Sequence, residues 1–479
     1  MTRARRRKHW GWGYEDQQPD RAGLEATAGE VRSRLGFGGE RVEEPVALDA
    51  IELASPRIDS PPSLARLFSA EPHDRISHGL GKAYRDIVRG LRGQVPHPPD
   101  LVARPATEAE IEQVLAWCAD ANVAAIPYGG GTSVVGGVEP RVDEGYGGAV
   151  SLDLGALDRV LEVDAVSRAA RIQAGALGPA LEDQLREHEL TLRHFPQSFE
   201  YSTLGGWIAT RAGGHFATRL THIDDLVESV RALTPSGEWA SRRLPGSGAG
   251  PSPDRMLLGS EGILGVITEA WVRLQVRPRF KVSRGVAFDD FLAGAEAVRE
   301  LAQSGLDPSN CRLLDPAEVA LTHAAPAGRA MLVLGFESAH HPVEGAMEVA
   351  LEVARAHGGE PQEAKDPAPS NEQRPQTPSG PGGTRSWRPP TCVTRSSARA
   401  CSARPSRRRS RGTGSRGFTR RSARPPASPS PRLAARLRTA LARRSSAAAS
   451  RMSIPTGRRP TTPSSARRSA AARSSSGTR

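Results

Sequence analysis

A glycine-rich segment is the strongest candidate in the sequence for binding an anion. Residues 127–137 read PYGGGTSVVGG and follow Ala124–Pro127, an apolar run that we expect to be a short buried strand. Glycines let the backbone approach a ligand closely and adopt positive φ. Successive N–H groups in such a turn bind anions, and Thr132 and Ser133 add hydroxyl donors. Pyrophosphate is the natural ligand, although a tight structural turn explains the same glycines; the segment matches neither a Walker A loop nor a Rossmann fingerprint.

Two more glycine-rich turns follow along the chain. Residues 196–214 read PQSFEYSTLGGWIATRAGG, in which pairs of glycines bracket a short predicted helix. Glycines in a helix are destabilising unless close approach is needed, so either tight helix–sheet packing or a ring lying on the backbone would explain them. Residues 259–270 read GSEGILGVITEA, which predicts a turn entering a core strand and could place backbone groups beside an adenine or a flavin. The three turns in this order are more specific than any one of them.

The elements around these turns indicate an α+β fold. The segment T-E-A-E at 107–110 is a capping box that begins an apolar-striped helix through Cys118. Residues 1–100 show little periodicity and read as a lead-in. In the first unit we expect helices at 107–118, 179–189 and 203–211, and strands at 124–127, 149–154, 160–163, 169–173, 226–233, 238–241 and 266–276. In a second unit, beginning near Val282, we expect strands at 286–288, 312–314 and 331–336, and helices at 291–302 and 343–357, which suits a small sheet covered by helices on one face.

The combination of motifs resembles a known family of flavoproteins. The similarity is to the PCMH-type FAD-binding domain of the vanillyl-alcohol-oxidase superfamily, and it is carried by HWGWGYED (9–16), the Arg85–Arg89 stretch, PYGGGTSV, PQSFEYSTLGGWIATRAGG, HIDDLVESVRALTPSG (222–237), LLGSEGILGVITEA and CRLLDPAEV (311–319). Within it, they resemble the alkyldihydroxyacetonephosphate synthases and their bacterial relatives, over about residues 5–365. The resemblance implies a lead-in (1–96), a two-subdomain PCMH-type FAD-binding domain (97–278) and a partial α+β cap domain (279–365).

The resemblance also implies which residues contact FAD. These residues are Pro127, Tyr128, Gly129, Gly130, Gly131, Thr132, Ser133, Pro196, Gln197, Ser198, Phe199, Glu200, Tyr201, Ser202, Thr210, Arg211, Ala212, Gly213, Glu261, Gly262, Ile263, Leu264, Gly265, Val266 and Ile267. Superfamily members often attach FAD covalently through a histidine in the first loop. That loop holds Thr132 and Ser133 and no histidine here, so we expect non-covalent FAD.

The activity that the resemblance implies is an exchange of acyl for alkyl on acyl-dihydroxyacetone phosphate, with a fatty alcohol as second substrate, in ether-lipid synthesis. Oxidised FAD acts there as an electrophile whose N5 holds the substrate carbon, without net redox change. Arg312 resembles a cap-domain arginine important for that activity, and a fixed guanidinium suits holding a substrate. Two alternatives remain open: an FAD-linked oxidase or dehydrogenase of a 2-hydroxy acid, and an inactive FAD-binding remnant.

Other classes of site and location are not indicated. The four cysteines and the His340-His341 pair lack metal-ligand spacing, so no metal site is expected. The basic N-terminus has no apolar segment and no stretch is long enough to span a bilayer, so we expect a cytoplasmic protein. The resemblance is compatible with peripheral membrane contact and with a homodimer, and no specific nucleic-acid partner is expected.

The C-terminal segment, residues 366–479, differs abruptly in composition from the rest. It holds 26 arginines, two acidic residues and only eight large apolar residues, so it cannot bury enough apolar surface to fold. Its charge could attract polyanions, but its composition is that of a GC-rich gene read in a different frame. We interpret it as a disordered, frameshifted tail that replaces the native end of the cap. The family's C-terminal tyrosine and histidines then have no counterpart, because no Tyr follows Tyr201 and no His follows His357.

Limited trypsin digestion tests this interpretation of the tail. Because like charges repel and little apolar area opposes them, trypsin is expected to remove the tail at its many arginines and leave a fragment ending near Lys365. Mass spectrometry of the resistant fragment gives its C-terminus. A resistant fragment that still contains residues 366–479 would show that the tail folds.

Overall fold

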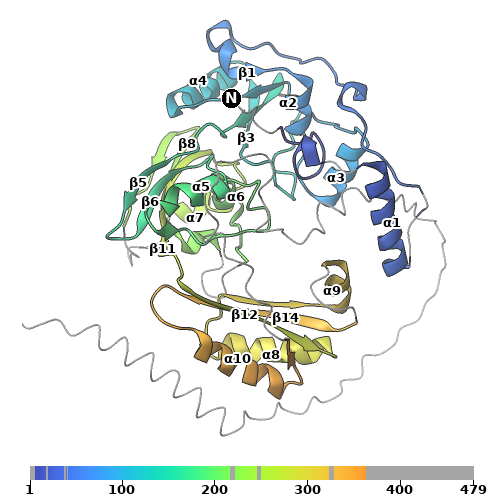
Figure 1. Ribbon diagram of the computed structural model, residues 1–479. Coiled ribbons are helices and arrows are strands. Elements are labelled where there is room, and N and C mark those ends of the chain that lie inside the picture. The colour runs from blue at the N-terminus through green and yellow to red at the C-terminus, as the bar shows by residue number, and fades with distance from the viewer. Residues whose placement is uncertain are drawn as a thin grey trace, which may run out of the picture. The chain divides into compact units, whose positions relative to one another are not determined.

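The computed structural model describes residues 6–17, 20–36, 39, 41–215, 222–244, 250–322 and 328–362 (Figure 1). The chain divides into two units, Met1–Arg424 and Pro425–Arg479, and every described residue lies in the first. The predicted disordered tail, residues 366–479, lies outside the described residues.

The N-terminal hundred residues form more regular structure than the sequence predicts. Helix α1 is capped by the Asp20 carboxylate, which accepts a hydrogen bond from the Gly23 N–H, and it ends at Gly36 in the left-handed region. Leu24 and Ala28, one turn apart, are buried and Val31 continues the same face, a short apolar stripe that sequence reasoning missed. The elements here are η1 (Glu15–Gln17), α1 (Arg21–Leu35), η2 (Leu48–Ala50), η3 (Pro62–Leu67), β1 (Phe68–Ser69), α2 (Pro72–Ser77) and α3 (Tyr84–Leu91).

The first sheet carries the glycine-rich loop at the end of one strand. Its order is β1-β2-β4-β3, and β4 (Gly148–Asp153) runs parallel to both β2 (Leu101–Ala103) and β3 (Val123–Tyr128). The predicted capping of α4 (Glu108–Asp120) is present, since the Thr107 hydroxyl accepts from the Glu110 N–H. Buried apolar residues of α4 pack on the sheet. The register pairs Tyr128 with Asp153, so β3 delivers the loop beside the end of β4.

The second sheet is antiparallel, in the order β5-β6-β10-β8-β9. Helices α5 and α6 pack on it through a core that includes Leu181, Leu204 and Trp207. The prediction of one strand over 266–276 is wrong, because the strand is interrupted at Leu274. The Leu274 N–H donates to the Arg168 carbonyl, and the two residues that follow form β11, which pairs with β7. The elements are β5 (Val160–Asp164), β6 (Ala169–Gln173), α5 (Gly178–Arg186), β7 (Leu190–Thr191), α6 (Leu204–Thr210), η4 (Ile223–Asp225), β8 (Val227–Thr234), β9 (Gly237–Ala240), α7 (Asp254–Leu257), β10 (Val266–Arg273) and β11 (Gln275–Val276).

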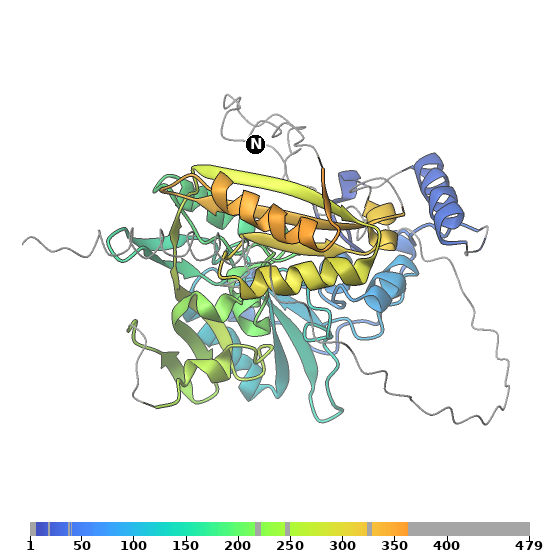
Figure 2. The ribbon, with the colours of Figure 1, turned by 90° about the horizontal axis from the view of Figure 1, so that it is seen from below.

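The third sheet has the order β13-β14-β12-β15, with α8 and α10 on the same face (Figures 1 and 2). The expected small sheet is confirmed, with the two long helices on one face, but α9, which the sequence did not predict, packs its Val319 on the other face against Ala287 and Met331 (Figure 1). The predicted strand 286–288 is only the buried end of β12, because the first half of β12 alternates between exposed and half-buried residues and has no apolar run. The elements are β12 (Phe280–Phe288), α8 (Phe291–Gln303), β13 (Asn310–Leu314), α9 (Pro316–Thr322), β14 (Ala330–Ser338), α10 (Glu344–Ala356) and β15 (Glu360–Pro361).

Two ion pairs connect the third sheet, and the segment between β11 and β12 that enters it, to α5 and to the residues after β7. The Arg193 guanidinium, just after β7, contacts the Glu337 carboxylate on β14, and both side chains are mostly buried. Arg277, between β11 and β12, lies 3.5 Å from the Glu182 carboxylate of α5. Buried or partly buried pairs of this kind resist separation because breaking one leaves an uncompensated charge.

Candidate cofactor site

The three glycine-rich turns, which are far apart in sequence, converge on one cleft of about 410 Å³. We call this cleft the cofactor pocket. One wall is the loop after β3, the second is α6 with the residues that follow it, and the third is the turn before β10. The lining residues that sequence reasoning had assigned to FAD are Pro127, Tyr128, Gly129, Gly130, Gly131, Thr132, Ser133, Ser198, Ser202, Thr210, Arg211, Ala212, Gly213, Glu261, Gly262, Gly265 and Ile267.

Other predicted contacts lie outside the cofactor pocket. Val266 is one of them, because side chains alternate along a strand: Ile267 lines the pocket, and Val266 therefore points to the core of the first sheet. Phe199 stacks on Trp207 in the second core, and Ile263 is 82% exposed at the tip of its turn. The remaining predicted contacts that do not line the pocket are Pro196, Gln197, Glu200, Tyr201 and Leu264. Their contact with FAD stays a prediction.

The glycine-rich loop is held from behind by the N-terminal residues. The Arg7 guanidinium donates a hydrogen bond of 2.8 Å to the Gly130 carbonyl and a longer one, 3.3 Å, to the Tyr201 carbonyl. The Lys82 backbone N–H donates a 2.7 Å bond to the Ser133 carbonyl. Two carbonyl groups of the loop therefore point away from the cofactor pocket. Sequence reasoning missed this support, because nothing in the composition of residues 1–100 links them to the loop.

This arrangement orients the loop's donors. The C=O and N–H of a trans peptide point in opposite directions, so fixing the Gly130 carbonyl turns the Gly131 N–H toward the pocket that Gly131 lines. The Ser133 carbonyl does the same for the Val134 N–H. Within the described chain, the N–H groups of residues 130–134 donate no hydrogen bond. Free amide donors at a glycine-rich turn fit the diphosphate of FAD.

The glycines of the site have two different roles. A Cβ at Gly130 would lie 1.8 Å from the Tyr201 carbonyl oxygen, and one at Gly205 would lie 2.7 Å from the Ala174 Cβ, so these two glycines permit packing within the protein. Ligand approach, which the sequence suggested, is not the reason for them. Gly206 differs, because it lines the cofactor pocket and a Cβ there would meet only the Thr203 hydroxyl, at 3.3 Å. The empty space above Gly206 is therefore part of the cofactor pocket.

Two carboxyl groups near the pocket are affected by burial. Burial raises the pKa of the Glu261 carboxyl, which lines the pocket, and that of Glu200, which lies on the segment before α6. Arg211, also in the lining, is 2.7 Å from the buried Asp224 carboxylate. Repulsion of a bound diphosphate by acidic groups in this wall is thereby reduced.

Arg312 lies on β13 in the third sheet and lines neither the cofactor pocket nor the cleft beside it. Its guanidinium contacts the Glu318 carboxylate of α9. Burial, and secondly the positive charge of Arg312, lower the pKa of His215, which follows the Gly213-Gly214 pair. Arg312 therefore lies within electrostatic reach of the residues that close the second glycine motif.

Metal and membrane features were also sought. In the described part of the chain, no group of three His, Cys, Asp or Glu side chains could hold a metal ion. Among the same residues, no helix has the length and apolar character needed to cross a bilayer.

Comparison with known proteins assigns the class. Residues 99–241 match the family described as "FAD binding domain", and residues 277–374 match "FAD linked oxidases, C-terminal domain". The chain belongs to the FAD-linked family with a PCMH-type FAD-binding domain of the vanillyl-alcohol-oxidase type, and FAD is its cofactor.

Within that class, the chain is similar to alkyldihydroxyacetonephosphate synthase. The Dictyostelium discoideum protein of that name is 35% identical over 316 residues, which are 63% of this chain and 51% of that protein. A solved alkyldihydroxyacetonephosphate synthase structure superposes with a TM-score of 0.65 at 28% identity, covering 75% of this chain and 74% of the other. The mitochondrial D-lactate dehydrogenase (cytochrome) of Arabidopsis thaliana is 31% identical over 224 residues, 46% of this chain and 38% of that protein. The chain spans about half the length of the synthase that it matches.

A valine at Gly206 tests the pocket directly. Apart from the Thr203 hydroxyl at 3.3 Å, its Cβ would meet no neighbour within 4 Å, and the side chain would enter the space above α6, so we expect FAD affinity to fall at least about tenfold, more than 1.4 kcal/mol, while the FAD-free protein keeps its melting temperature. Titration followed by flavin fluorescence measures the affinity. Gly29→Val is the control, since Gly29 is also helical, has nothing within 4 Å and lies on α1. Equal FAD affinity in both variants would place the cofactor elsewhere.

Removing Arg7 tests the support of the loop. Arg7→Met loses a charge-assisted bond worth about 1.5–3 kcal/mol, so FAD is expected to bind about 10- to 100-fold more weakly, with partial recovery in Arg7→Lys. Arg6→Met is the matched control, because Arg6 is half exposed and faces Glu15 at 3.8 Å. If Arg7→Met bound FAD as tightly as Arg6→Met, the loop would not depend on this contact.

Proposed function

We propose that the chain is built for an FAD-dependent transfer reaction of the alkyldihydroxyacetonephosphate synthase type. The substrates would be an acyl-dihydroxyacetone phosphate and a fatty alcohol, and the product an ether-lipid precursor. The observation that carries the proposal is the similarity to that synthase, in sequence over 316 residues and in structure across the FAD-binding and cap regions. Bound FAD would supply an electrophilic ring, with no net oxidation or reduction.

The chain's own residues would bind and orient the reactants. The loop amides and α6 would hold the cofactor, and the buried lining, including Trp207 and Ile267, would exclude water from it. Arg312, fixed by Glu318 and within electrostatic reach of His215, would hold an anionic substrate at the cap side. We propose a cytoplasmic protein of bacterial type, and non-covalent FAD, because no histidine lies in the loop after β3.

The second candidate is an FAD-linked dehydrogenase of a 2-hydroxy acid. The 31% identity to a D-lactate dehydrogenase over the FAD-binding region favours it, since the two classes share that region. Mixing the FAD-loaded chain with D-lactate without oxygen separates them. A dehydrogenase would bleach the flavin absorbance, whereas the proposed transferase would leave the flavin oxidised.

Two measurements test the proposed function. Acid precipitation of the FAD-loaded chain is expected to release the yellow colour into the supernatant; colour in the pellet would mean a covalent bond. Turnover with palmitoyl-dihydroxyacetone phosphate and hexadecanol is expected to be low or absent for this chain, because the family's C-terminal tyrosine and histidines have no counterpart in residues 366–479. Restoring a relative's C-terminal segment is expected to raise it. Fast turnover by the chain as it stands would contradict the assignment of those catalytic groups, and no turnover by the restored chain would contradict the transferase.

A further inference from the structure

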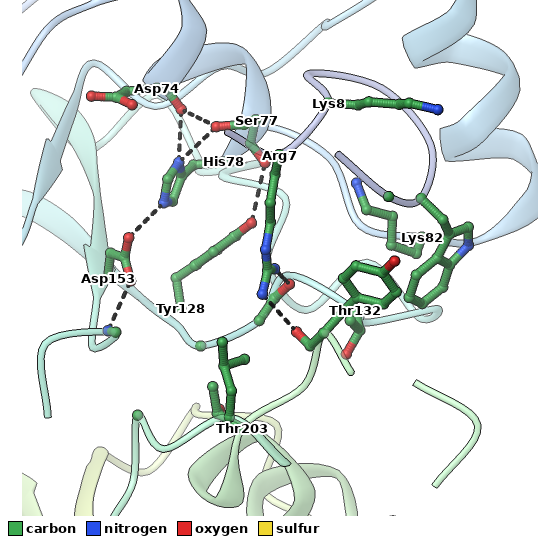
Figure 3. Close-up of a pocket in the computed structure, with 18 of the residues that line it drawn as sticks. Arg7, Lys8, Asp74, Ser77, His78, Lys82, Tyr128, Thr132, Asp153 and Thr203 are labelled. Carbon is green, nitrogen blue, oxygen red and sulfur yellow. Dashed lines mark hydrogen bonds and ion pairs between the residues drawn. The ribbon is translucent and has the colours of Figure 1, made fainter. Parts of the chain in front are cut away.

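A second cleft, of about 310 Å³, lies behind the glycine-rich loop (Figure 3). We call it the basic pocket. It shares five lining residues with the cofactor pocket, namely Tyr128, Gly129, Gly130, Thr132 and Thr203. Its other walls come from the N-terminal segment, from α2 and its following turn, and from the ends of β4 and β6. The residues that give it its charge are Arg7, Lys8, Asp74, His78, Lys82, Arg104, Asp153 and Asp158.

Two of the basic side chains, Arg104 and His78, are paired with carboxylates of the same pocket. Arg104 lies 2.8 Å from Asp74 and 3.4 Å from Asp153. The His78 Nδ1 lies 2.7 Å from the Asp74 carbonyl oxygen, and its Nε2 lies 3.2 Å from the Asp153 carboxylate. The Ser77 hydroxyl lies 3.2 Å from the same Nδ1, so these contacts hold the ring between α2 and the end of β4.

The contact with His78 also affects the ionisation of the Asp153 carboxyl. Burial opposes ionisation of Asp153, but His78, the Gly155 N–H and Arg104 together outweigh it and lower the pKa of that carboxyl. Hydrogen bonds with His73 first, and then with Arg104, lower the pKa of the Asp74 carboxyl, so both carboxylates are ionised and already paired within the protein.

The other cations of the basic pocket have no such partner. Arg7, Lys8 and Lys82 form no ion pair with any carboxylate in the described part of the chain, although Asp16 and Asp86 act on the two lysines from farther away. Lys8 is only 8% exposed. Burial, and secondly the charge of Arg7, lower the pKa of Lys82 to about 8. Among the lining residues, Asp158 is the one carboxylate left to offset three cations.

Unpaired ammonium groups in a partly dry cleft are unfavourable unless an anion enters. The Thr132 hydroxyl adds a donor at the same wall, and Trp12, Leu177 and Ala180 give the cleft an apolar side. Several cations with hydroxyl donors suit a phosphate dianion, and the volume leaves room for the small organic part of a phosphate ester.

We propose that the basic pocket is an anion site that binds a phosphate group, held by Lys82 with Arg7 and Lys8. The proposal goes beyond the cofactor assignment and does not depend on the transferase chemistry. The phosphate belongs to a small phosphorylated ligand other than the cofactor, whose diphosphate we assign to the loop amides in the cofactor pocket, and the experiment separates the two.

Calorimetric titration of the full chain tests the proposal, with inorganic phosphate and glycerol 3-phosphate as probes and sodium chloride as the ionic-strength control. Lys82→Met is expected to weaken phosphate binding at least tenfold, with recovery in Lys82→Arg. Lys281→Met is the matched control, because Lys281 is exposed on β12 and this variant keeps the same arginine-rich tail. Circular dichroism checks folding, and Lys8→Met serves if Lys82→Met does not fold.

The outcomes assign the source or reject the site. Phosphate binding by the FAD-loaded chain that depends on Lys82 supports a separate phosphorylated ligand. Lys82-dependent binding by the FAD-free chain alone, with weaker FAD binding in Lys82→Met, would instead make the cofactor's diphosphate the occupant and would overturn the proposal of a separate anion site. Equal phosphate affinity of Lys82→Met and Lys281→Met would overturn the proposal. The absence of phosphate binding to either variant would overturn it as well. None of these outcomes requires turnover, so failure of the proposed function is seen separately.

Discussion

The orientation of two peptide groups is the constraint on which the site depends. The carbonyls of Gly130 and Ser133 are held by the Arg7 guanidinium and the Lys82 backbone N–H, so the amide donors that follow them turn to the cofactor pocket. A glycine-rich loop alone samples many conformations, and fixing it before the ligand arrives reduces the entropy lost on binding. The loop provides the amide donors, and Arg7 and Lys82 fix their orientation.

The same constraint explains why the site is assembled from distant parts of the chain. The loop ends β3 of the first sheet, whereas α6 and the turn before β10 belong to the second, and the cofactor pocket lies where these elements meet. The third sheet adds Arg312, and the ion pair of Arg193 with Glu337 ties that sheet to the residues that follow β7. The cofactor pocket and the arginine proposed to hold the substrate thus lie on different sheets, which this ion pair connects.

Sequence reasoning succeeded where local chemistry decides the structure and failed where long-range contacts do. The three glycine turns and the Thr107 cap are local, and each could be read from neighbouring residues. The end of β10 is not local, because residues 275 and 276, just beyond it, pair with β7, about 85 positions earlier. Arg7 contacts a loop 123 positions away, and no periodicity or motif marks it. The role of Gly130 was misjudged for the same reason, since its neighbour is the backbone of Tyr201.

A crystal structure of the FAD-loaded chain tests the central claim most directly. The account predicts that the diphosphate lies in the cofactor pocket on the amides of residues 131–134, with the Arg7 guanidinium still bonded to the Gly130 carbonyl. A Gly130 carbonyl rotated toward the cofactor, or a diphosphate away from these amides with the Arg7 contact broken, would contradict it.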